Sequence, residues 1–256
     1  MFISDLDKLA FVDFNNNKVS FPELKRRIKY FSEEIFKEIE SPHALIIMEN
    51  RPEWVYTFYA VWDKKVVNVI IDASSNPNEI VYVINDSQPK TIICSNFSEE
   101  RVIEAINIAN YKDSVRVINI DKENMDFNSI GDKYDKSILV NPEDDETAAM
   151  LYTSGTTGNP KGVMLSSNNL LGEIDGLFEK EVITFKDQML VLLPYHHVLP
   201  LMATLLLQLK KGLSIVFVEK IASKEILETL EKNNVTIMVG VPRVYKLFYD
   251  GIKNQI

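Results

Sequence analysis

Short runs of apolar residues recur along the chain and alternate with longer stretches in which apolar residues fall every three or four positions. The short runs predict buried strands. They lie at 44–48, 66–71, 91–94, 115–120, 189–193, 213–218 and 236–241. The wider spacing predicts amphipathic helices between them. Because apolar strands that alternate with helices are buried on both faces, the pattern predicts an α/β fold of parallel-sheet subdomains flanked by helices.

The N-terminal segment has a different pattern. Asparagines at 15–17 separate two short apolar pieces, 10–14 and 19–21, which predicts a hairpin. Pro22 suits the first turn of a helix. The apolar spacing that follows continues this helix to about Ile39.

A polar stretch divides the chain. Residues 121–145 are acidic and contain few large apolar side chains, which is typical of a surface excursion between two α/β halves. We therefore expect a first α/β subdomain at about 1–145 and part of a second at 146–256.

One apolar stretch, 189–209, is long enough to suggest a transmembrane helix. Pro194, His196, His197 and Pro200 interrupt it. The pattern favours a strand, a loop and then a helix from about Pro200. We expect no transmembrane segment.

Composition narrows the function classes. The chain has 46% hydrophobic and 25% charged residues, an ordinary globular composition, and a formal charge of −9. That charge argues against nucleic-acid binding, which needs a basic surface. Cys94 is the single cysteine, and the N-terminus lacks a signal peptide. Both observations favour a reducing, cytoplasmic location.

Residues 151–171, LYTSGTTGNPKGVMLSSNNLL, hold the candidate chemistry. Gly155 and Gly158 allow positive φ, so that successive N–H groups can turn inward around an anion. Lys161 adds a mobile positive charge. Hydroxyl donors come from Thr153, Ser154, Thr156 and Thr157. This combination suits a polyphosphate. Because the acidic net charge does not attract a polyphosphate, binding must depend on the geometry of the loop and on Lys161.

The loop is not a Walker A motif, which needs a glycine five residues after the first one and a Ser or Thr after the lysine. Counted from Gly155, these positions hold Pro160 and Gly162. A flexible Ser/Thr/Gly linker is the alternative interpretation. The fixed Pro-Lys-Gly exit into an apolar run argues against a linker.

The segment TSGTTGNPKG resembles the phosphate-binding signature of the adenylate-forming enzymes, at every position. That superfamily contains acyl-CoA synthetases, peptide-synthetase adenylation domains and luciferases. Many relatives have Thr-His where this chain has Ser166-Ser167. This difference from the signature lies at the start of a helix that begins near Asn168, where either serine can serve as the N-cap.

A second segment, LLPYHHV at 192–198, resembles another signature of the superfamily, and His197 is the matching histidine. The resemblance implies a catalytic position beside the acyl carboxylate, at the carboxyl end of a strand. The alternative is a capping or packing histidine. His196 has no counterpart in the signature.

A third segment, VGVPRVY at 239–245, resembles a strand-to-helix segment of long-chain fatty-acyl-CoA synthetases. The resemblance implies that Val239, Gly240 and Val241 line the acyl pocket. The alternative is an ordinary buried strand followed by a proline at the start of a helix.

Together these resemblances imply ATP-dependent activation of a carboxylic acid, most like a long-chain fatty acid, and transfer of the acyl group to CoA. The loop would bind phosphates through Thr153, Ser154, Gly155, Thr156, Thr157, Gly158 and Lys161. Mg²⁺ would bridge phosphate oxygens, with Thr153 as a ligand or close contact.

Other interpretations stay open. The chain could belong to an acyl-carrier-protein synthetase, to a peptide-synthetase adenylation domain, or to a non-catalytic nucleotide-binding or interaction module. The resemblance implies the N-terminal part of the large domain of such an enzyme, with the C-terminal domain absent and the fragment inactive alone. Acyl length, peripheral membrane contact and oligomeric state are left open.

Overall fold

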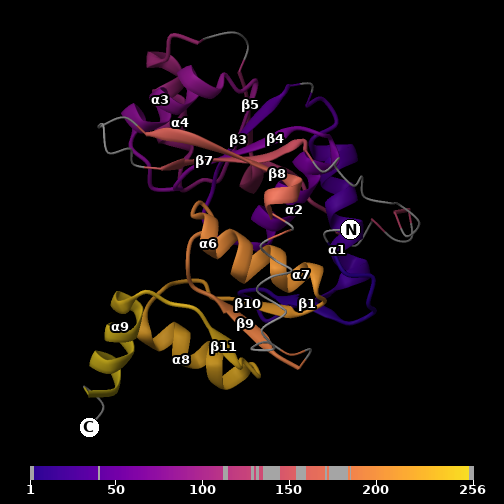
Figure 1. The fold of residues 1–256 in the computed structure, drawn as a ribbon, viewed down its shortest axis with the longest axis vertical. Coiled ribbons are helices and arrows are strands. Elements are labelled where there is room, and N and C mark those ends of the chain that lie inside the picture. The colour runs from indigo at the N-terminus through magenta and orange to yellow at the C-terminus, as the bar shows by residue number, and fades with distance from the viewer. Residues whose placement is uncertain are drawn as a thin grey trace. The chain divides into compact units, whose positions relative to one another are not determined.

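The computed structural model describes residues 3–39, 41–111, 115–127, 130, 133–134, 145–153, 160–170, 172, 184 and 186–253. The chain forms two compact units. Unit 1 contains Met1–Leu24 and Glu173–Ile256, and unit 2 contains Lys25–Gly172. Figure 1 shows both units, each with a sheet and helices packed on it.

The sheet of unit 2 has the strand order β6-β5-β3-β4-β7-β8. Its strands are β3 (His43–Ile47), β4 (Val67–Ile70), β5 (Thr91–Cys94), β6 (Arg116–Asn119), β7 (Thr147–Thr153) and β8 (Lys161–Ser166). The neighbours from β6 to β7 are parallel, whereas β8 runs antiparallel to β7 at the edge. The expected parallel sheet is therefore confirmed, and its antiparallel edge strand is an addition.

Two helical segments of unit 2 precede its first strand, and the others alternate with its strands. They are α1 (Phe21–Tyr30, which starts in unit 1), the π-helix η1 (Phe31–Ile35), α2 (Pro52–Asp63), α3 (Pro77–Ser87), α4 (Glu99–Ile108) and the 3₁₀ turn η2 (Ile120–Lys122). Asn76 and Glu79 form a reciprocal capping box at the start of α3. Ile80 and Ile84 bury α3 in the same core cluster as Val69 of the sheet. This packing fixes α3 against the strands.

The sheet of unit 1 has the order β11-β9-β10-β1-β2. Its strands are β1 (Leu9–Val12), β2 (Lys18–Ser20), β9 (Gln188–Val191), β10 (Ser214–Phe217) and β11 (Ile237–Met238). All neighbouring pairs are parallel except the β1–β2 hairpin, which the asparagine cluster predicted. Its helical segments are α6 (Val198–Pro200), η3 (Leu201–Leu206), α7 (Leu207–Lys210), α8 (Ser223–Lys232) and α9 (Pro242–Lys253).

The division into units differs from the boundary expected near residue 145. β7 follows that position, but it pairs with β4, so the segment up to Gly172 stays with unit 2. β1 pairs with β10, so the N-terminal segment belongs to unit 1. Strand pairing between distant parts of the chain therefore determines which segments belong to each unit. A polar stretch in the sequence does not predict this pairing.

Two helix boundaries also differ from expectation. The first helix ends at Ile35 rather than near Ile39, after a π-turn in which the Phe36 N–H donates to the Phe31 carbonyl. The helix expected from Pro200 begins at Val198. No helix in the described ranges has the length and apolar character that crossing a membrane requires.

Candidate phosphate-binding site

The stem of the predicted phosphate loop is the β7–β8 hairpin of unit 2. Thr153 ends β7, Lys161 begins β8, and the two residues are paired across the strands. Both are exposed. Because β7 runs parallel to β4, Thr153 lies at the carboxyl edge of the sheet, where open α/β sheets bind ligands. Figure 1 shows the two strands side by side, with the connecting segment drawn in grey.

Five of the predicted phosphate contacts lie outside the described residues. They are Ser154, Gly155, Thr156, Thr157 and Gly158. Their roles stay predictions. Of the expected loop residues, the structure brings together Thr153 and Lys161.

Gly162 has a packing role next to Lys161. It is paired with Tyr152, and a Cβ built on it would lie 3.0 Å from Met150 Sδ and 3.2 Å from Tyr152 Cζ. Those distances are shorter than ordinary carbon contacts. The absence of a side chain at Gly162 therefore lets Tyr152 and Met150 lie over β8.

Tyr152 is also tied to α3. Its hydroxyl donates to Asp86 Oδ2 at 2.6 Å, and its ring makes an edge contact with Tyr82, with centroids 6.4 Å apart. Burial raises the pKa of Tyr152, and the hydrogen bond to Asp86 raises it further, so the phenol stays a neutral donor. No local pattern predicts this contact, since Asp86 and Tyr152 lie 66 residues apart in the chain.

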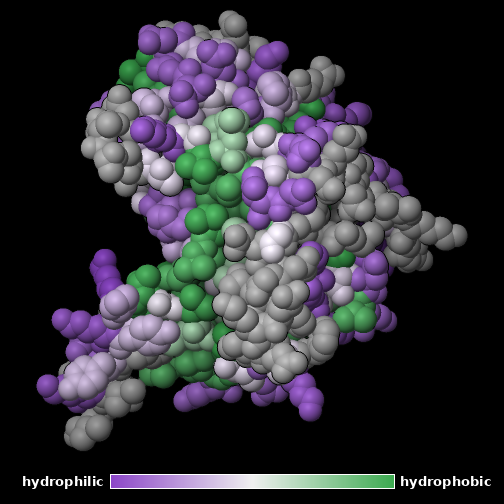
Figure 2. All heavy atoms as spheres, viewed as in Figure 1, coloured by the Kyte–Doolittle hydropathy of each residue, from purple (hydrophilic) through white to green (hydrophobic). Residues whose placement is uncertain are grey.

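Two neighbouring apolar side chains of β8 are exposed. Val163 is 43% exposed and Met164 is 64% exposed. In Figure 2 hydrophobic side chains reach the surface over the part of unit 2 where Figure 1 draws β7 and β8. β8 pairs with β7 alone among the described strands, so β8 depends on β7 for its place in the sheet.

A helical turn follows β8, as the serine pair predicted. The Asn169 N–H donates to Ser166 Oγ at 3.2 Å, and the Ser166 N–H donates back to Asn169 Oδ1 at 3.0 Å. This reciprocal pair has the form of a capping box. Ser166 is thus the cap, and Ser167 is buried with its N–H donating to the Glu146 carbonyl.

His197 lies in unit 1, in the segment after the carboxyl end of β9. Its side chain is exposed and makes no capping hydrogen bond, while its carbonyl accepts the Leu201 N–H at 3.1 Å. The ring of His196 lies beside it, with centroids 4.1 Å apart. The imidazole of His197 is therefore accessible rather than packed in the core.

Val239, Gly240 and Val241 follow β11 and precede α9. The strand expected over 236–241 is much shorter, since only Ile237 and Met238 pair with β9. Val239 and Gly240 are half-buried, and Val241 is 46% exposed. Because β9 and β11 are parallel neighbours, this segment and the one that carries His197 leave the sheet at the same edge.

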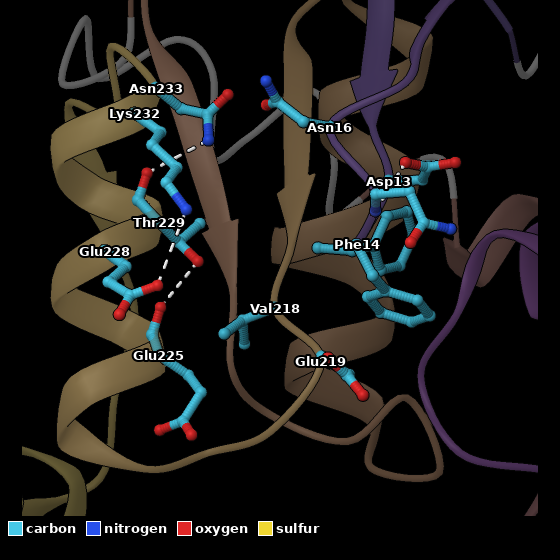
Figure 3. A pocket seen from close by; sticks show the side chains of 12 residues that line it. Asp13, Phe14, Asn16, Val218, Glu219, Glu225, Glu228, Thr229, Lys232 and Asn233 are labelled. Carbon is cyan, nitrogen blue, oxygen red and sulfur yellow. Dashed lines mark hydrogen bonds and ion pairs between the residues drawn. The ribbon is translucent and has the colours of Figure 1, made fainter.

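Unit 1 also has a polar cavity of about 240 Å³, which contains none of the predicted site residues. It lies between the β1–β2 turn, the end of β10 and α8. Figure 3 shows Asp13, Glu219, Glu225 and Glu228 around it, with Lys232 as the cation. In the part of the chain that the structure describes, no three His, Cys, Asp or Glu side chains are grouped so that they could hold a metal ion.

Comparison with known proteins identifies the family. The sequence matches the AMP-binding enzyme family over residues 4–255, and the chain therefore belongs to that family. Fatty acyl-CoA synthetase A of Dictyostelium discoideum is 30% identical over 219 residues, which are 79% of this chain and 32% of that protein. The 2-succinylbenzoate–CoA ligase of Bacillus velezensis is 26% identical over 239 residues, 92% of this chain and 46% of that protein.

Solved structures show the same fold. ATP-bound MatB from Rhodopseudomonas palustris superposes with a TM-score of 0.78 at 23% identity, over 96% of this chain and 48% of MatB. The inhibitor-bound N-terminal domain of FACL13 from Mycobacterium tuberculosis gives 0.80 at 21% identity, over 94% of this chain and 61% of that one. The expected fold, the N-terminal part of the large domain of an adenylate-forming enzyme, is confirmed. The chain spans less than half the length of the curated relatives it matches.

Proposed function

We propose that this chain supplies the phosphate-binding part of an enzyme that activates a carboxylic acid with ATP and passes the acyl group to CoA. The observation that carries the proposal is the hairpin stem at the carboxyl edge of the unit 2 sheet. Thr153 and Lys161 are paired at the loop end of this stem, on either side of residues 154–160 of the signature segment. The curated relatives that match include CoA ligases named for different acids.

The reaction has two steps. A carboxylate oxygen attacks the α-phosphorus of ATP, which forms an acyl-adenylate and releases pyrophosphate. The sulfur of CoA then attacks the acyl carbon, AMP leaves, and the thiol proton passes to solvent. Positive charge and N–H donors around the departing pyrophosphate stabilise the charge that develops on it.

Lys161 supplies the charge in this scheme. Its side chain is exposed at the start of β8, and in this proposal it contacts the β- and γ-phosphates. Thr153 offers a neutral hydroxyl at the other end of the loop. Mg²⁺ takes most of its ligands from phosphate and water in such sites, so a single hydroxyl from Thr153 is compatible with it.

We assign the acid to the carboxyl edge of the sheet in unit 1. His197 would contact the carboxylate, and Val239, Gly240 and Val241 would line the acyl chain. The apolar segment 239–241, half-buried at Val239 and Gly240, suits an alkyl group. Support for a fatty acid comes from the relatives named fatty acyl-CoA synthetase A and long chain acyl-CoA synthetase 6. The 4-coumarate–CoA ligases among the relatives make an aromatic acid the second candidate.

The test compares Lys161→Ala with Lys90→Ala. Lys90 is also an exposed lysine of unit 2, but it precedes β5 at the opposite, amino edge of the same sheet. We expect Lys161→Ala to weaken pyrophosphate binding by the chain about ten- to a hundred-fold, the range for a charged hydrogen bond, and Lys90→Ala to leave it unchanged. Titration calorimetry measures both.

Acid-dependent exchange of pyrophosphate into ATP tests the reaction in the full-length enzyme. Palmitate, 4-coumarate, 2-succinylbenzoate and malonate form the panel of acids. Exchange with palmitate alone supports the fatty-acid assignment, and exchange with 4-coumarate alone replaces it with the aromatic one. If wild type, Lys161→Ala and Lys90→Ala bind pyrophosphate equally, the loop does not bind the phosphates.

A further inference from the structure

We propose that Tyr152, held by Asp86, is a positioning residue that fixes the stem of the phosphate loop. This inference rests on the proposed function, since it concerns the loop that would bind the phosphates. Tyr152 immediately precedes Thr153, and its hydroxyl donates to Asp86 Oδ2 at 2.6 Å. The bond joins the end of β7 to the last turn of α3.

The anchor on α3 is firm because that helix is buried on its other side. Ile80, Val83 and Ile84 of α3 are fully or almost fully buried in the core cluster with the strands. The capping box of Asn76 and Glu79 fixes its N-terminus. Asp86 is therefore a carboxylate held by a helix whose position the core determines.

The anchor matters most for the outer strand of the stem, which lies at the edge of the sheet. β8 is an edge strand that pairs with β7 alone among the described strands. Its middle residues Val163 and Met164 are 43% and 64% exposed. Strand ends with few buried contacts open readily. The hydrogen bond of Tyr152 acts at the end of the stem, where opening would begin.

The neighbours of Tyr152 are arranged for this contact. Gly162 leaves room for the ring on the paired strand, where a Cβ would lie 3.2 Å from Tyr152 Cζ. Tyr82 of α3 meets the ring edge-on at an interplanar angle of 88°. The ring is thus confined between α3 and β8, and its hydroxyl is directed to Asp86. A displaced Tyr152 would move Thr153, which is bonded to it in the chain.

Hydrogen–deuterium exchange of the unliganded chain tests the anchor directly. Tyr152→Phe removes only the hydroxyl, and Asp86→Ala removes its acceptor. We expect both variants to raise the exchange rate of peptides covering 150–163 about two- to ten-fold, the range for one net hydrogen bond, without changing peptides from β3 and β4. Asp86→Asn keeps an acceptor oxygen and should exchange like wild type.

A matched control comes from Tyr82→Phe. Tyr82 lies on α3 beside Tyr152, and its hydroxyl makes no hydrogen bond within the described part of the chain. This variant should leave the exchange unchanged. If Tyr152→Phe and Asp86→Ala exchange like wild type at 150–163, or if exchange rises equally throughout unit 2, the positioning role is overturned.

Pyrophosphate binding connects the anchor to the site. We expect Tyr152→Phe and Asp86→Ala to raise the dissociation constant about two- to ten-fold at a temperature where each is fully folded, and the double variant to be no worse than either single one. If Lys161→Ala weakens binding and these variants do not, the positioning inference fails alone. If Lys161→Ala has no effect, the proposed function fails, and the exchange experiment still decides the anchor.

Discussion

Thr153 and Lys161 are paired across the antiparallel strands β7 and β8, at the two ends of the segment that carries the phosphate signature. Residues paired in this way have Cα atoms about 4.5–5.5 Å apart. A chain that leaves and returns over so short a distance must turn back on itself. The N–H groups of the segment that joins these two residues are predicted to surround an anion.

Gly162→Ala tests the packing of this stem. A Cβ at this position would meet Met150 Sδ at 3.0 Å and Tyr152 Cζ at 3.2 Å. The neighbours must shift, and overpacking of this kind typically costs about 1–3 kcal/mol. We expect the free energy of unfolding to fall by that amount and pyrophosphate binding to weaken, because the displaced Tyr152 precedes Thr153. Urea unfolding and calorimetry measure the two effects.

Gly172→Ala is the control for this substitution. A Cβ on Gly172 would meet nothing within 4 Å, and the residue is helical. Alanine there should be neutral or stabilising by about 0.4–1 kcal/mol, because it restricts the unfolded chain. Equal stabilities for Gly162→Ala and wild type would contradict the packing role of Gly162.

The local pattern of the sequence predicted most of the described elements. Apolar runs located β3, β4, β5 and β9, because these strands are buried on both faces and leave a continuous hydrophobic signal. The β1–β2 hairpin followed from its asparagines. Local signals succeed where burial and turn chemistry are decided by neighbouring residues.

Relationships between distant residues were not predictable in this way. The pairing of β1 with β10 joins the two ends of the chain in one sheet, and no local signal reports it. β11 is shorter than its apolar run, because pairing with β9 ends at Met238. The contact of Asp86 with Tyr152 likewise depends on how α3 packs. Such features arise from tertiary packing, which single-sequence patterns do not encode.

His197→Ala separates a role in the site from a role in packing. The side chain is exposed and makes no capping hydrogen bond, so its loss should change the free energy of unfolding by no more than about 0.5 kcal/mol. If it contacts the carboxylate, acid-dependent exchange of pyrophosphate into ATP in the full-length enzyme should fall at least several-fold. His196→Ala is the matched control. A lower melting temperature with unchanged exchange per folded molecule would refute the assignment.

Cys94 should be unreactive in the folded protein. It is buried in β5, and burial, with a smaller contribution from the Glu99 carboxylate, raises the pKa of its thiol to about 12 from an ordinary value of 9.0. At pH 8 this means about a thousand-fold less thiolate than in the unfolded chain, and thiolate is the species that reacts. Iodoacetamide labelling with and without urea measures the difference. Fast labelling of the native chain would contradict it.

The raised pKa of Cys94 also makes the free energy of unfolding depend on pH. The unfolded thiol loses its proton near pH 9, whereas the folded one keeps it to about pH 12. The folded state therefore binds more protons in this window, and the free energy of unfolding falls as pH rises through it. Cys94→Ala lacks this contribution, so the stability difference between wild type and the variant should be constant below pH 8 and narrow above pH 9. A difference that stays constant up to pH 11 would count against the shift.

Lys29 and Asp63 form a buried ion pair that unit 2 should need for stability. Lys29 Nζ lies 2.9 Å from Asp63 Oδ2 and 3.2 Å from Oδ1, and Ser32 Oγ donates to Oδ2 at 2.7 Å. The Lys29 side chain is 11% exposed and that of Asp63 is 4% exposed. Lys29→Met removes this ion pair while the carboxylate of Asp63 stays buried. We expect a loss of about 3–5 kcal/mol in the free energy of unfolding.

Two further variants distinguish this cost from a general effect of losing a lysine. Lys122 forms an ion pair with Glu99, and the Lys122 side chain is 62% exposed. Lys122→Met should therefore cost only about 0–1 kcal/mol. Lys29→Met combined with Asp63→Leu removes both buried charges and should recover most of the lost stability, because apolar pairs often replace buried ion pairs without loss. Urea unfolding followed by the fluorescence of Trp54 and Trp62, which lie on α2 with Asp63, measures all three. If Lys29→Met costs no more than Lys122→Met, the pair does not stabilise unit 2.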